Sequence, residues 1–493
     1  MIRQAVLLVG GKGTRLRPLT DRYPKPIIPV LDKPCVRYLI DSMIKAGVTE
    51  VIMACGYRSE RMASALGDGS DLGIKISYAY EDEPMGTGGA VKLLEDRLDD
   101  VFIMANGDVF SDMDVRKEID EHIRSGASVT ISLTEVDDPT QYGIVGLDDT
   151  GRVTRFLEKP KKEEAFSNLI NSGVYIVNKD VLKNIPSGVM YDMSKELFPL
   201  LLDKGYHLQG HRIDGHFRDV GRPFDLYESN KEVALREGGG RDGLLYCGEG
   251  SSFSGKASDS MIMAGCSVKD SELCKSLILP FAKVDGSRIE NSILGRGCIV
   301  RKGCTVRNAV IADGAVIPEG TVIDGDVPKL KKKAVFLDRD DTINDDVGHC
   351  SRPEDINLFP GVSKALRRLN DAGFLTLMIT NQSVIARGMT DEAGLERIHD
   401  KMRDDLLSTG GGIIDDIFFC PHHPDAGCEC RKPKPLLGIR AIEKHDVDVS
   451  ESYMIGDSGK DIEFGKNIGV RPIKVDEKYT FIDAVNDIMD GKV

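Results

Sequence analysis

Two segments at opposite ends of this chain carry residues suited to binding phosphate. The loop Gly10-Gly11-Lys12-Gly13-Thr14-Arg15-Leu16 follows the apolar run Ala5–Val9, and the segment Asp338-Arg339-Asp340-Asp341-Thr342 follows the apolar run Ala334–Leu337. Short apolar runs of this kind predict buried strands of a parallel sheet. Because α/β sheets bind ligands beyond the carboxyl ends of their strands, both segments are candidate sites and predict two enzymes in series.

The first segment is rich in glycine. Gly10, Gly11 and Gly13 let backbone N–H groups approach a triphosphate, and Arg15 adds a fixed positive charge. The spacing differs from the P-loop, which has Gly-Lys-Ser/Thr after four intervening residues, and from the dinucleotide fingerprint, which has a small residue where Leu16 stands. The loop alone is therefore weak evidence, since ordinary glycine turns have the same composition.

Composition limits the partners of the chain. Its 493 residues suggest about three domains, and a formal charge of −14 opposes general binding to nucleic acid or to a membrane surface. There is no apolar run of the roughly 18 residues needed to span a bilayer, and no signal peptide, so we expect a cytoplasmic protein. The eleven cysteines then indicate reduced thiols rather than a disulfide framework.

Residues 1–238 form the first expected domain. Apolar, β-branched runs at 51–54, 101–104 and 129–132 alternate with helical stretches at 36–46 and 114–124. This alternation predicts a mixed, largely parallel sheet with helices on both faces, a Rossmann-like α/β fold. The segment Glu237-Gly238-Gly239-Gly240 interrupts the pattern and indicates a boundary.

Residues 239–328 form the second expected domain, and a six-residue repeat runs through 291–323. One register of the repeat holds Ile293, Ile299, Thr305, Ile311, Ile317 and Ile323, and the next holds Ser292, Cys298, Cys304, Val310, Val316 and Val322. Six residues per side predict a short left-handed parallel β-helix with these positions in one inward column, the alternative being an irregular β meander. Pro280 and polar residues upstream suggest only a few turns. Coils of this kind space domains or join subunits, so the repeat also favours assembly of the chain into a homo-oligomer.

Residues 329–493 form the third expected domain, and the charged connector 328–333 spans the boundary before it. Strands at 334–337, 375–380 and 452–455 alternate with helices near 363–371 and 391–407. This pattern predicts a second α/β domain with a doubly wound parallel sheet.

Motifs beyond the glycine loop give the first domain a family resemblance. Pro24-Lys25-Pro26, Pro84–Ala90, Asn106-Gly107-Asp108, Tyr142-Gly143, Glu158-Lys159-Pro160, Asn171-Ser172-Gly173 and Asp219-Val220-Gly221 occur in the order found in the sugar-1-phosphate nucleotidyltransferases, which residues 1 to about 235 resemble. The resemblance implies transfer of a nucleotidyl group to a sugar 1-phosphate with release of pyrophosphate. Catalysis of this kind depends on positioning and charge neutralisation rather than on a covalent nucleophile.

The same resemblance assigns roles to individual residues. Arg15 and Lys25 would be catalytic and hold the triphosphate, and Asp108 and Asp219 would bind Mg²⁺. The nucleotide would lie against Gly10, Gly11, Gly13, Thr14, Arg15, Lys25, Gly86 and Thr87, and the sugar phosphate against Gly143, Glu158, Lys159 and Asn171. The loop Met85-Gly86-Thr87-Gly88-Gly89-Ala90 looks most like guanylyltransferases acting on heptose or mannose 1-phosphate, which favours GTP.

Residues 334–470 resemble the haloacid-dehalogenase phosphatases, in the branch that includes heptose 1,7-bisphosphate phosphatase and histidinol phosphatase. The resemblance implies Asp338 as nucleophile, Asp340 as general acid and base, and Lys432 as the catalytic cation. It also implies Mg²⁺ on Asp338, Asp340 and Asp457, with Asp461 nearby, and phosphate or sugar contacts from Thr380, Asn381 and Arg431.

Cysteines just before Lys432 have the spacing of metal ligands. Cys420, His422, Cys428 and Cys430 would close a tetrahedral Cys₃His site for structural Zn²⁺ that fixes the loop presenting Lys432. His423 is an alternative ligand to His422. The competing interpretation is three buried thiols and a surface histidine.

Two departures from the phosphatase pattern matter. Asp341 stands where the branch usually has glycine, and it adds a side chain at a sharp bend and negative charge where phosphate must arrive. Val384 and Ala386 also replace more common glycines. We therefore expect either a phosphatase of normal or reduced activity or a C-terminal domain that serves as a regulatory module.

The two resemblances together suggest one pathway. A sugar bisphosphate, heptose 1,7-bisphosphate in our interpretation, would lose its distal phosphate, and the resulting sugar 1-phosphate would react with a nucleoside triphosphate, GTP being favoured. The alternative is a mannose-1-phosphate guanylyltransferase whose C-terminal half acts on an unrelated phosphate ester.

Overall fold

The computed structural model describes residues 2–11, 13–56, 59–81, 83–345 and 347–493. Lys12 of the glycine-rich loop lies outside these residues. The chain folds into two compact units, the first holding the chain up to Leu16 together with residues 20–229, the second residues 17–19 and 230–493. In the described part of the chain, no helix has both the length and the apolar character needed to cross a membrane.

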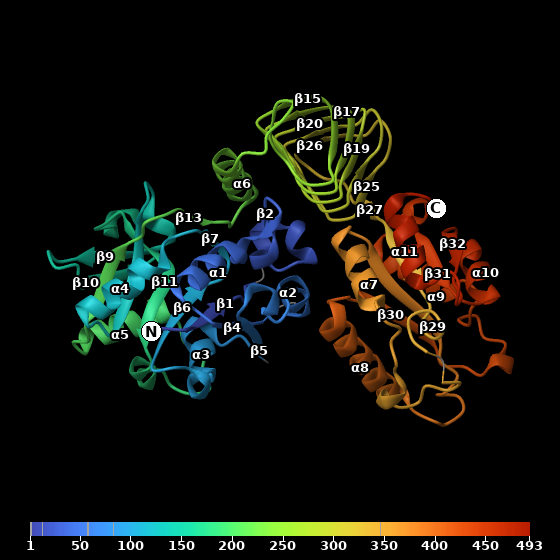
Figure 1. Ribbon diagram of the computed structural model, residues 1–493, viewed down its shortest axis with the longest axis horizontal. Coiled ribbons are helices and arrows are strands. Elements are labelled where there is room, and N and C mark those ends of the chain that lie inside the picture. The colour runs from blue at the N-terminus through green and yellow to red at the C-terminus, as the bar shows by residue number, and fades with distance from the viewer. Residues whose placement is uncertain (1, 12, 57–58, 82, 346) are drawn as a thin grey trace. The chain divides into compact units, whose positions relative to one another are not determined.

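The first unit is built on a nine-stranded mixed sheet (Figure 1). β5 (Lys75–Tyr80), β4 (Glu50–Cys55), β1 (Gln4–Leu8) and β6 (Val101–Asn106) are parallel neighbours. The sequence predicted a mixed, largely parallel sheet, and its antiparallel part centres on β11 (Leu169–Asn178), which runs antiparallel to β6, β8 (Val129–Glu135) and β9 (Gly143–Leu147). β10 (Val153–Glu158) pairs antiparallel with β9, and β12 (Leu208–Arg212) parallel with β8.

The strand order of the sheet reverses at β1. β4 and β5 lie to one side of β1, and β6 returns to its other side. Gly107 follows β6, and its N–H donates to the Leu8 carbonyl at 2.9 Å. A Cβ at Gly107 would lie 2.5 Å from the Val9 side chain, so this close approach requires glycine. The loops after β1 and β6 therefore meet at the crevice where α/β sheets bind ligands.

Helices cover both faces of this sheet. Val6, Phe102 and Ile131 belong to an apolar core shared with α3 (Gly86–Leu93) and α5 (Phe198–Asp203). Because side chains alternate along a strand, Thr130 and Ser132 of β8 face the opposite way, toward α4 (Val115–Ser125), which packs beside α1 (Cys35–Ala46).

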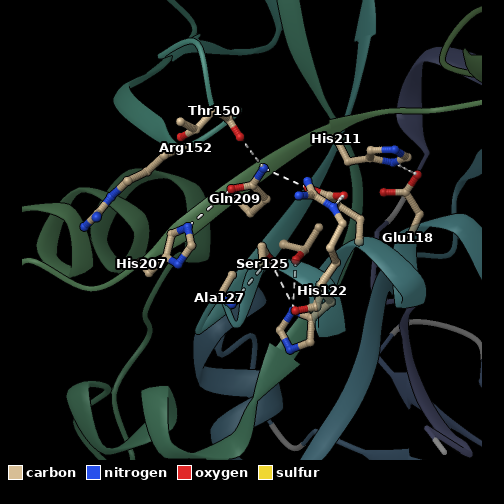
Figure 2. Close-up of polar contacts among 12 residues, drawn as sticks. Glu118, His122, Ser125, Ala127, Thr150, Arg152, His207, Gln209 and His211 are labelled. Atoms are coloured by element: carbon tan, nitrogen blue, oxygen red, sulfur yellow. Dashed lines mark hydrogen bonds and ion pairs between the residues drawn. The ribbon is translucent and has the colours of Figure 1, made fainter.

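The contact between α4 and the sheet is polar and buried (Figure 2). The fully buried Glu118 carboxylate accepts from Ser132 Oγ at 2.7 Å and from His211 Nδ1 at 2.8 Å. One turn later, His122 Nε2 donates to Asn178 Oδ1 at 3.1 Å, and its Nδ1 accepts from Thr130 at 2.9 Å. Hydrogen bonds therefore fix the position of α4 on this face, where an apolar layer would allow it to slide.

The second unit begins with α6 (Pro223–Glu237), which it shares with the first, and continues into a coil of short parallel strands (Figure 1). One face stacks β14 (Leu244–Cys247), β16 (Ser260–Ile262), β18 (Leu277–Ile278), β21 (Ile293–Leu294) and β24 (Val310–Ile311). The other sides hold β15 (Ser252–Ser258), β17 (Ser267–Cys274), β19 (Lys283–Asp285), β20 (Arg288–Glu290), β22 (Ile299–Val300), β23 (Thr305–Arg307), β25 (Ala315–Ile317) and β26 (Val322–Asp324). The predicted parallel coil is confirmed.

The inward column of the coil differs from the prediction. Ile293 pairs with Val310 and Thr305 with Val322, so a circuit takes 17 residues there and the six-residue register slips by one. Val322 is consequently 66% exposed, although the period placed it inside. The fully buried column runs through Leu294, Val300 and Val306, one residue beyond the predicted positions, and then through Ile311, Ile317 and Ile323, as predicted.

The coil is also longer than the sequence suggested, because the polar residues upstream are part of its construction. Ser276 N–H donates to Ser260 Oγ at 3.1 Å, and Ser292 N–H donates to Ser276 Oγ at 3.3 Å. These buried serines stack at one corner of successive circuits and satisfy backbone groups there. The connector after the coil is ordered as well, since β27 (Lys331–Lys332) pairs antiparallel with β25.

The C-terminal sheet is doubly wound, as predicted. Its parallel order is β30 (Asp416–Cys420), β29 (Leu375–Asn381), β28 (Ala334–Leu337), β31 (Tyr453–Gly456), β32 (Arg471–Lys474). One face packs against α7 (Val362–Asp371), α8 (Glu392–Gly410) and α11 (Phe481–Asp490), and the other against α9 (Leu436–His445) and α10 (Gly459–Asn467). The strand order reverses between β28 and β31, which places Asp338 and Asp457 at a second ligand-binding crevice.

The His211–Glu118 pair makes the anchoring of α4 dependent on pH. The hydrogen bond to Glu118 raises the pKa of His211 against the opposing effect of burial. The charged pair therefore stabilises the fold fully below the unfolded histidine value, and this contribution is lost as pH rises through the raised pKa. In the full-length protein, His211→Gln should speed amide exchange of residues 115–125 at pH 5.5 by roughly tenfold and much less at pH 8.5.

Hydrogen–deuterium exchange with mass spectrometry measures this effect. His207→Gln is the matched control, because the His207 ring contacts the neutral Gln209 side chain at 3.3 Å where His211 contacts a carboxylate (Figure 2). Equal acceleration at both pH values would contradict the role assigned to the charged pair.

Candidate functional sites

A lysine buried between two aspartates forms the centre of the N-terminal site. Asp108 follows β6, and Asp219 ends β13 (Phe217–Asp219), which pairs with β7 (Val109–Ser111) so that Asp219 lies opposite Val109. Lys25 Nζ lies 3.0 Å from Asp108 Oδ2 and 2.6 Å from Asp219 Oδ1. The structure thus brings together three predicted residues that are up to 194 positions apart in sequence.

The charge balance of this centre fits a cation. Burial lowers the pKa of Lys25, but Asp108 and Asp219 outweigh that effect and raise it. Lys25 thus stays charged and neutralises one of the two carboxylates. Carboxylate oxygens are the donors that Mg²⁺ takes together with substrate phosphates, so Asp108 and Asp219 are a donor set that fits Mg²⁺.

The glycine-rich loop is exposed beside this centre. Gly10, Gly11, Thr14 and Arg15 are exposed. Gly13 has φ +56°, and its carbonyl accepts from Thr20 Oγ1 at 2.8 Å, which fixes the turn. Arg15 Nη2 lies 3.9 Å from Asp219 Oδ2, so its guanidinium is held near the carboxylates and remains open to solvent.

Gly86 and Thr87 start α3, and both are tied to the segment after residue 190. Gly86 has φ +71°, and a Cβ there would lie 2.7 Å from the Tyr191 carbonyl. Thr87 Oγ1 accepts from the Met193 N–H at 2.9 Å. These contacts show Thr87 positioning the helix. The proposed contact with the nucleobase remains a prediction.

The predicted sugar-contacting residues gather at one end of β9, β10 and β11. Gly143 pairs with Glu158, and a Cβ at Gly143 would lie 2.7 Å from the Glu158 carboxylate. Burial raises the pKa of Glu158, and Asp192 adds to this effect. Asn171 Nδ2 donates to Tyr175 Oη at 2.7 Å. Lys159 follows β10 with φ +47°, an uncommon conformation for a residue with a side chain.

The C-terminal centre repeats the arrangement of a lysine between two aspartates. Lys432 Nζ lies 2.8 Å from Asp338 Oδ1 and 2.7 Å from Asp461 Oδ1, and Lys432 is buried. Burial raises the pKa of Asp338 to about 7 despite Lys432. Oxygens of Asp338, Asp457 and Asp461 all lie within 4.8 Å of one another, a donor set that fits Mg²⁺.

Asp340, Thr380 and Asn381 lie around this centre with their side chains already engaged. Both Asp340 oxygens accept from Arg339, at 2.8 and 2.9 Å. Thr380 Oγ1 accepts from Gln382 at 2.8 Å. The Asn381 side chain accepts from the Lys432 N–H at 3.0 Å and donates to its carbonyl at 3.4 Å. Asn381 therefore positions the Lys432 backbone, and its predicted contact with phosphate stays a prediction.

Four side chains near Lys432 are arranged as metal ligands. The Sγ atoms of Cys420, Cys428 and Cys430 lie 3.2 to 3.6 Å apart, and His422 Nδ1 lies 3.2 Å from Cys430 Sγ. Zn–S bonds of ~2.3 Å in a tetrahedron require ligand separations of ~3.8 Å, close to these values, so the cluster fits Zn²⁺.

Of the two candidate histidines, His422 is the one that lies within the cluster. His423 instead caps the following turn, accepting from the Asp425 N–H at 3.4 Å. Arg431 donates to the His422 carbonyl at 3.4 Å, which ties the cluster to the residue before Lys432.

A cavity of about 710 Å³ adjoins the C-terminal centre. Its lining includes five acidic residues and one basic residue, Lys474, with an apolar wall of Phe359, Pro360 and Ile482; the acids are Asp341, Asp345, Asp457, Asp476 and Glu477. Asp341 has φ +52°, the left-handed conformation that glycine adopts without strain. The backbone at this position thus keeps the shape expected for glycine.

Arg339 and Gln382, which bind Asp340, were not among the expected site residues. Arg339 was visible as a basic residue between two aspartates, a local signal. Gln382 is 42 positions away from Asp340, and nothing in its sequence neighbourhood indicates the contact.

Comparisons with known proteins agree with this architecture. Residues 4–236 match the family model for nucleotidyl transferases, residues 247–340 that for the GlmU-like C-terminal hexapeptide, and residues 323–469 that for haloacid dehalogenase-like hydrolases. The chain therefore joins a nucleotidyl transferase domain, a hexapeptide coil and a haloacid dehalogenase-like domain.

Among curated proteins, a mannose-1-phosphate guanylyltransferase of Mycobacterium tuberculosis is 38% identical over 231 residues, 46% of this chain. A UTP–glucose-1-phosphate uridylyltransferase of Synechocystis is 34% identical over 248 residues, 48% of this chain. The chain spans 64% of the length of each. Among solved structures, HddC from Yersinia pseudotuberculosis, complexed with GMP-PN, has 27% identity and a TM-score of 0.41, covering 47% of this chain and all of that one.

Replacing Lys25 in the N-terminal site should strongly slow nucleotidyl transfer. Lys25→Met leaves Asp108 and Asp219 facing each other without their shared cation, and we expect pyrophosphate release to fall about 10²- to 10³-fold. Phosphate release should be unchanged. Lys33→Met, at an exposed lysine 3.7 Å from Asp41, is the control and should retain activity. Full activity of Lys25→Met would exclude Lys25 from the reaction.

The cysteine cluster should hold one metal ion per chain. Metal analysis of the purified protein should find about one zinc, which Cys428→Ser should largely remove, while His423→Ala should keep it. Because the cluster fixes the loop before Lys432, Cys428→Ser should also lower phosphate release and leave pyrophosphate release intact. Equal zinc in wild type and Cys428→Ser would contradict this assignment.

Proposed function

We propose that this fusion of a nucleotidyl transferase domain with a haloacid dehalogenase-like domain is a bifunctional enzyme of nucleotide-sugar synthesis. The C-terminal half removes the distal phosphate of a sugar bisphosphate, heptose 1,7-bisphosphate in our proposal. The N-terminal half then transfers GMP from GTP to the sugar 1-phosphate and releases pyrophosphate. The main support is the pair of centres in which a buried lysine joins two aspartates, Lys25 at one crevice and Lys432 at the other.

The N-terminal half works by positioning and charge. Arg15 and the glycine loop bind the triphosphate, Lys25 neutralises charge that develops on the α-phosphate, and Glu158 and Asn171 hold sugar hydroxyls. The sugar phosphate oxygen forms a bond to the α-phosphorus as the bond to pyrophosphate breaks. Mg²⁺ bound to Asp108 and Asp219 would supply further charge neutralisation.

The C-terminal half works through a covalent intermediate. An Asp338 oxygen bonds to phosphorus, the bond from phosphorus to the sugar oxygen breaks, and Asp340 gives that oxygen a proton. A water oxygen then attacks phosphorus, its proton passes to Asp340, and the bond to Asp338 breaks to release phosphate. Lys432 holds phosphoryl oxygens throughout, while Mg²⁺ on the Asp338 and Asp457 carboxylates would reduce repulsion between anions.

The acidic cavity beside the C-terminal centre limits which part of the substrate can bind there. Its volume suits the sugar that leaves the phosphoryl group, and its carboxylates can accept hydrogen bonds from sugar hydroxyls. Five acidic residues against one lysine oppose a second phosphate inside it. We therefore place the retained 1-phosphate of a bisphosphate outside the cavity, near Arg431.

Mannose 1-phosphate is the second candidate for the N-terminal half. The guanylyltransferase from Mycobacterium tuberculosis, 38% identical over the matched residues, favours it. Under this alternative the C-terminal half acts on an unrelated phosphate ester or has a regulatory role.

A panel of substrates tests the proposal. The full-length protein receives heptose and mannose 1-phosphates and heptose 1,7-bisphosphate with each nucleoside triphosphate and Mg²⁺, and pyrophosphate and phosphate are measured separately. We expect pyrophosphate from heptose 1-phosphate with GTP, and phosphate from the bisphosphate. Asp108→Asn should abolish only the first signal and Asp338→Asn only the second. If mannose 1-phosphate gave pyrophosphate and heptose 1-phosphate gave none, the heptose assignment would be refuted.

Asp341 distinguishes an active phosphatase from an impaired one. If the native site is active, Asp341→Gly should change phosphate release less than about threefold. The same variant should raise the thermal stability of the C-terminal domain, because a left-handed residue costs roughly 1 kcal/mol that glycine avoids. Calorimetry and phosphate assays measure the two effects. A gain in phosphate release of tenfold or more would instead support the regulatory alternative.

A further inference from the structure

The proposed reaction leaves one fully buried charge without a role. The Arg339 side chain is 0% exposed and lies between the two aspartates of the nucleophile segment. Its Nε donates to Asp340 Oδ1 at 2.8 Å and its Nη2 to Asp340 Oδ2 at 2.9 Å. A bidentate contact of this kind fixes the orientation of the carboxylate plane as well as the position of the carboxylate.

A glutamine completes the network on one side of Asp340. Gln382 Nε2 donates to Asp340 Oδ2 at 3.1 Å and to Thr380 Oγ1 at 2.8 Å, while its Oε1 accepts from Arg339 Nη2 at 3.0 Å. Gln382 and Arg339 are both buried, so their side of this hydrogen-bonded ring is shielded from water. The ring connects the end of β29 to the segment after β28.

The two oxygens of Asp340 are therefore not equivalent. Oδ2 accepts from both Arg339 and Gln382, which fills the two lone-pair sites of that oxygen. Oδ1 accepts one short bond from Arg339, and the Asn344 amide approaches it only to 3.5 Å. The Asp340 side chain as a whole is 24% exposed, and Oδ1 is the oxygen whose second contact is the longer one, so Oδ1 is the better placed of the two for a further partner.

We propose that Arg339, supported by Gln382, is a positioning residue that holds Asp340 so that Oδ1 exchanges protons in both steps of phosphate release. This inference rests on the proposed phosphatase function. Oδ1 gives its proton to the departing sugar oxygen and later takes one from the attacking water, while Oδ2 stays bound to the Arg339–Gln382 pair.

Arg339 contributes to the fold as well, so activity loss alone would be ambiguous. An aryl phosphate separates the two effects, because nitrophenolate leaves without a proton from Asp340 while hydrolysis of the aspartyl-phosphate still needs Asp340 as a base. Misplacing Asp340 should therefore let the first step proceed and delay the second. A general loss of structure should slow both steps.

The experiment uses full-length Arg339→Lys and Gln382→Leu with Mg²⁺ and p-nitrophenyl phosphate in a stopped-flow instrument. Both variants should release about one nitrophenolate per active site at close to the wild-type rate, then turn over 10- to 100-fold more slowly. With a sugar phosphate they should show no burst and a similar fall in kcat, with KM nearly unchanged. Gln382→Leu keeps the test valid if Arg339→Lys fails to fold.

Arg352→Met is the matched control, since it removes an arginine that pairs with an aspartate elsewhere in the same domain, Arg352 with Asp355 at 3.2 Å. It should leave both phases unchanged. A burst slowed as much as the steady state, or an unchanged kcat in both variants, would overturn the assignment of Arg339. A wild-type protein that releases phosphate from no ester would instead refute the proposed function, and this inference with it.

Discussion

A buried lysine shared by two carboxylates is the interaction on which each candidate site depends. An isolated charge in a protein interior is unstable, so Lys25 and Lys432 remain charged there only because Asp108 with Asp219, and Asp338 with Asp461, surround them. When both of its carboxylates are ionised, each pair of aspartates carries one negative charge more than its lysine cancels. That excess suits a divalent cation and a phosphate that arrive together.

Each centre lies where the strand order of its sheet reverses, and the geometry of the strand connections explains this position. At β1 and β6, and again at β28 and β31, neighbouring parallel strands continue to opposite sides, so their following loops separate and leave a crevice. Backbone carries much of the positioning there. Gly107 allows close approach in the first crevice, and the Asn381 side chain holds the backbone of Lys432 in the second.

Polar groups, rather than apolar packing, fix several of the elements around these centres. The buried Glu118 and His122 hold α4 on its sheet, stacked serines form a corner of the coil, and Arg339 with Gln382 holds Asp340. Hydrogen bonds are directional, and leaving a buried donor unpaired is costly. Such contacts therefore specify one arrangement where packing alone would permit several.

The sequence by itself predicted several strands of both α/β sheets, the order of the domains, the repeat and the residue types proposed for both sites, because these are local signals of period, spacing and motif. It could not determine the slipped register of the coil, which depends on how each circuit closes. Nor could it show that Asn381 binds the backbone of Lys432 or that Gln382 binds Asp340. Only the tertiary structure decided those contacts, since they join residues that are distant in sequence and are selected by burial, where every polar group must find a partner.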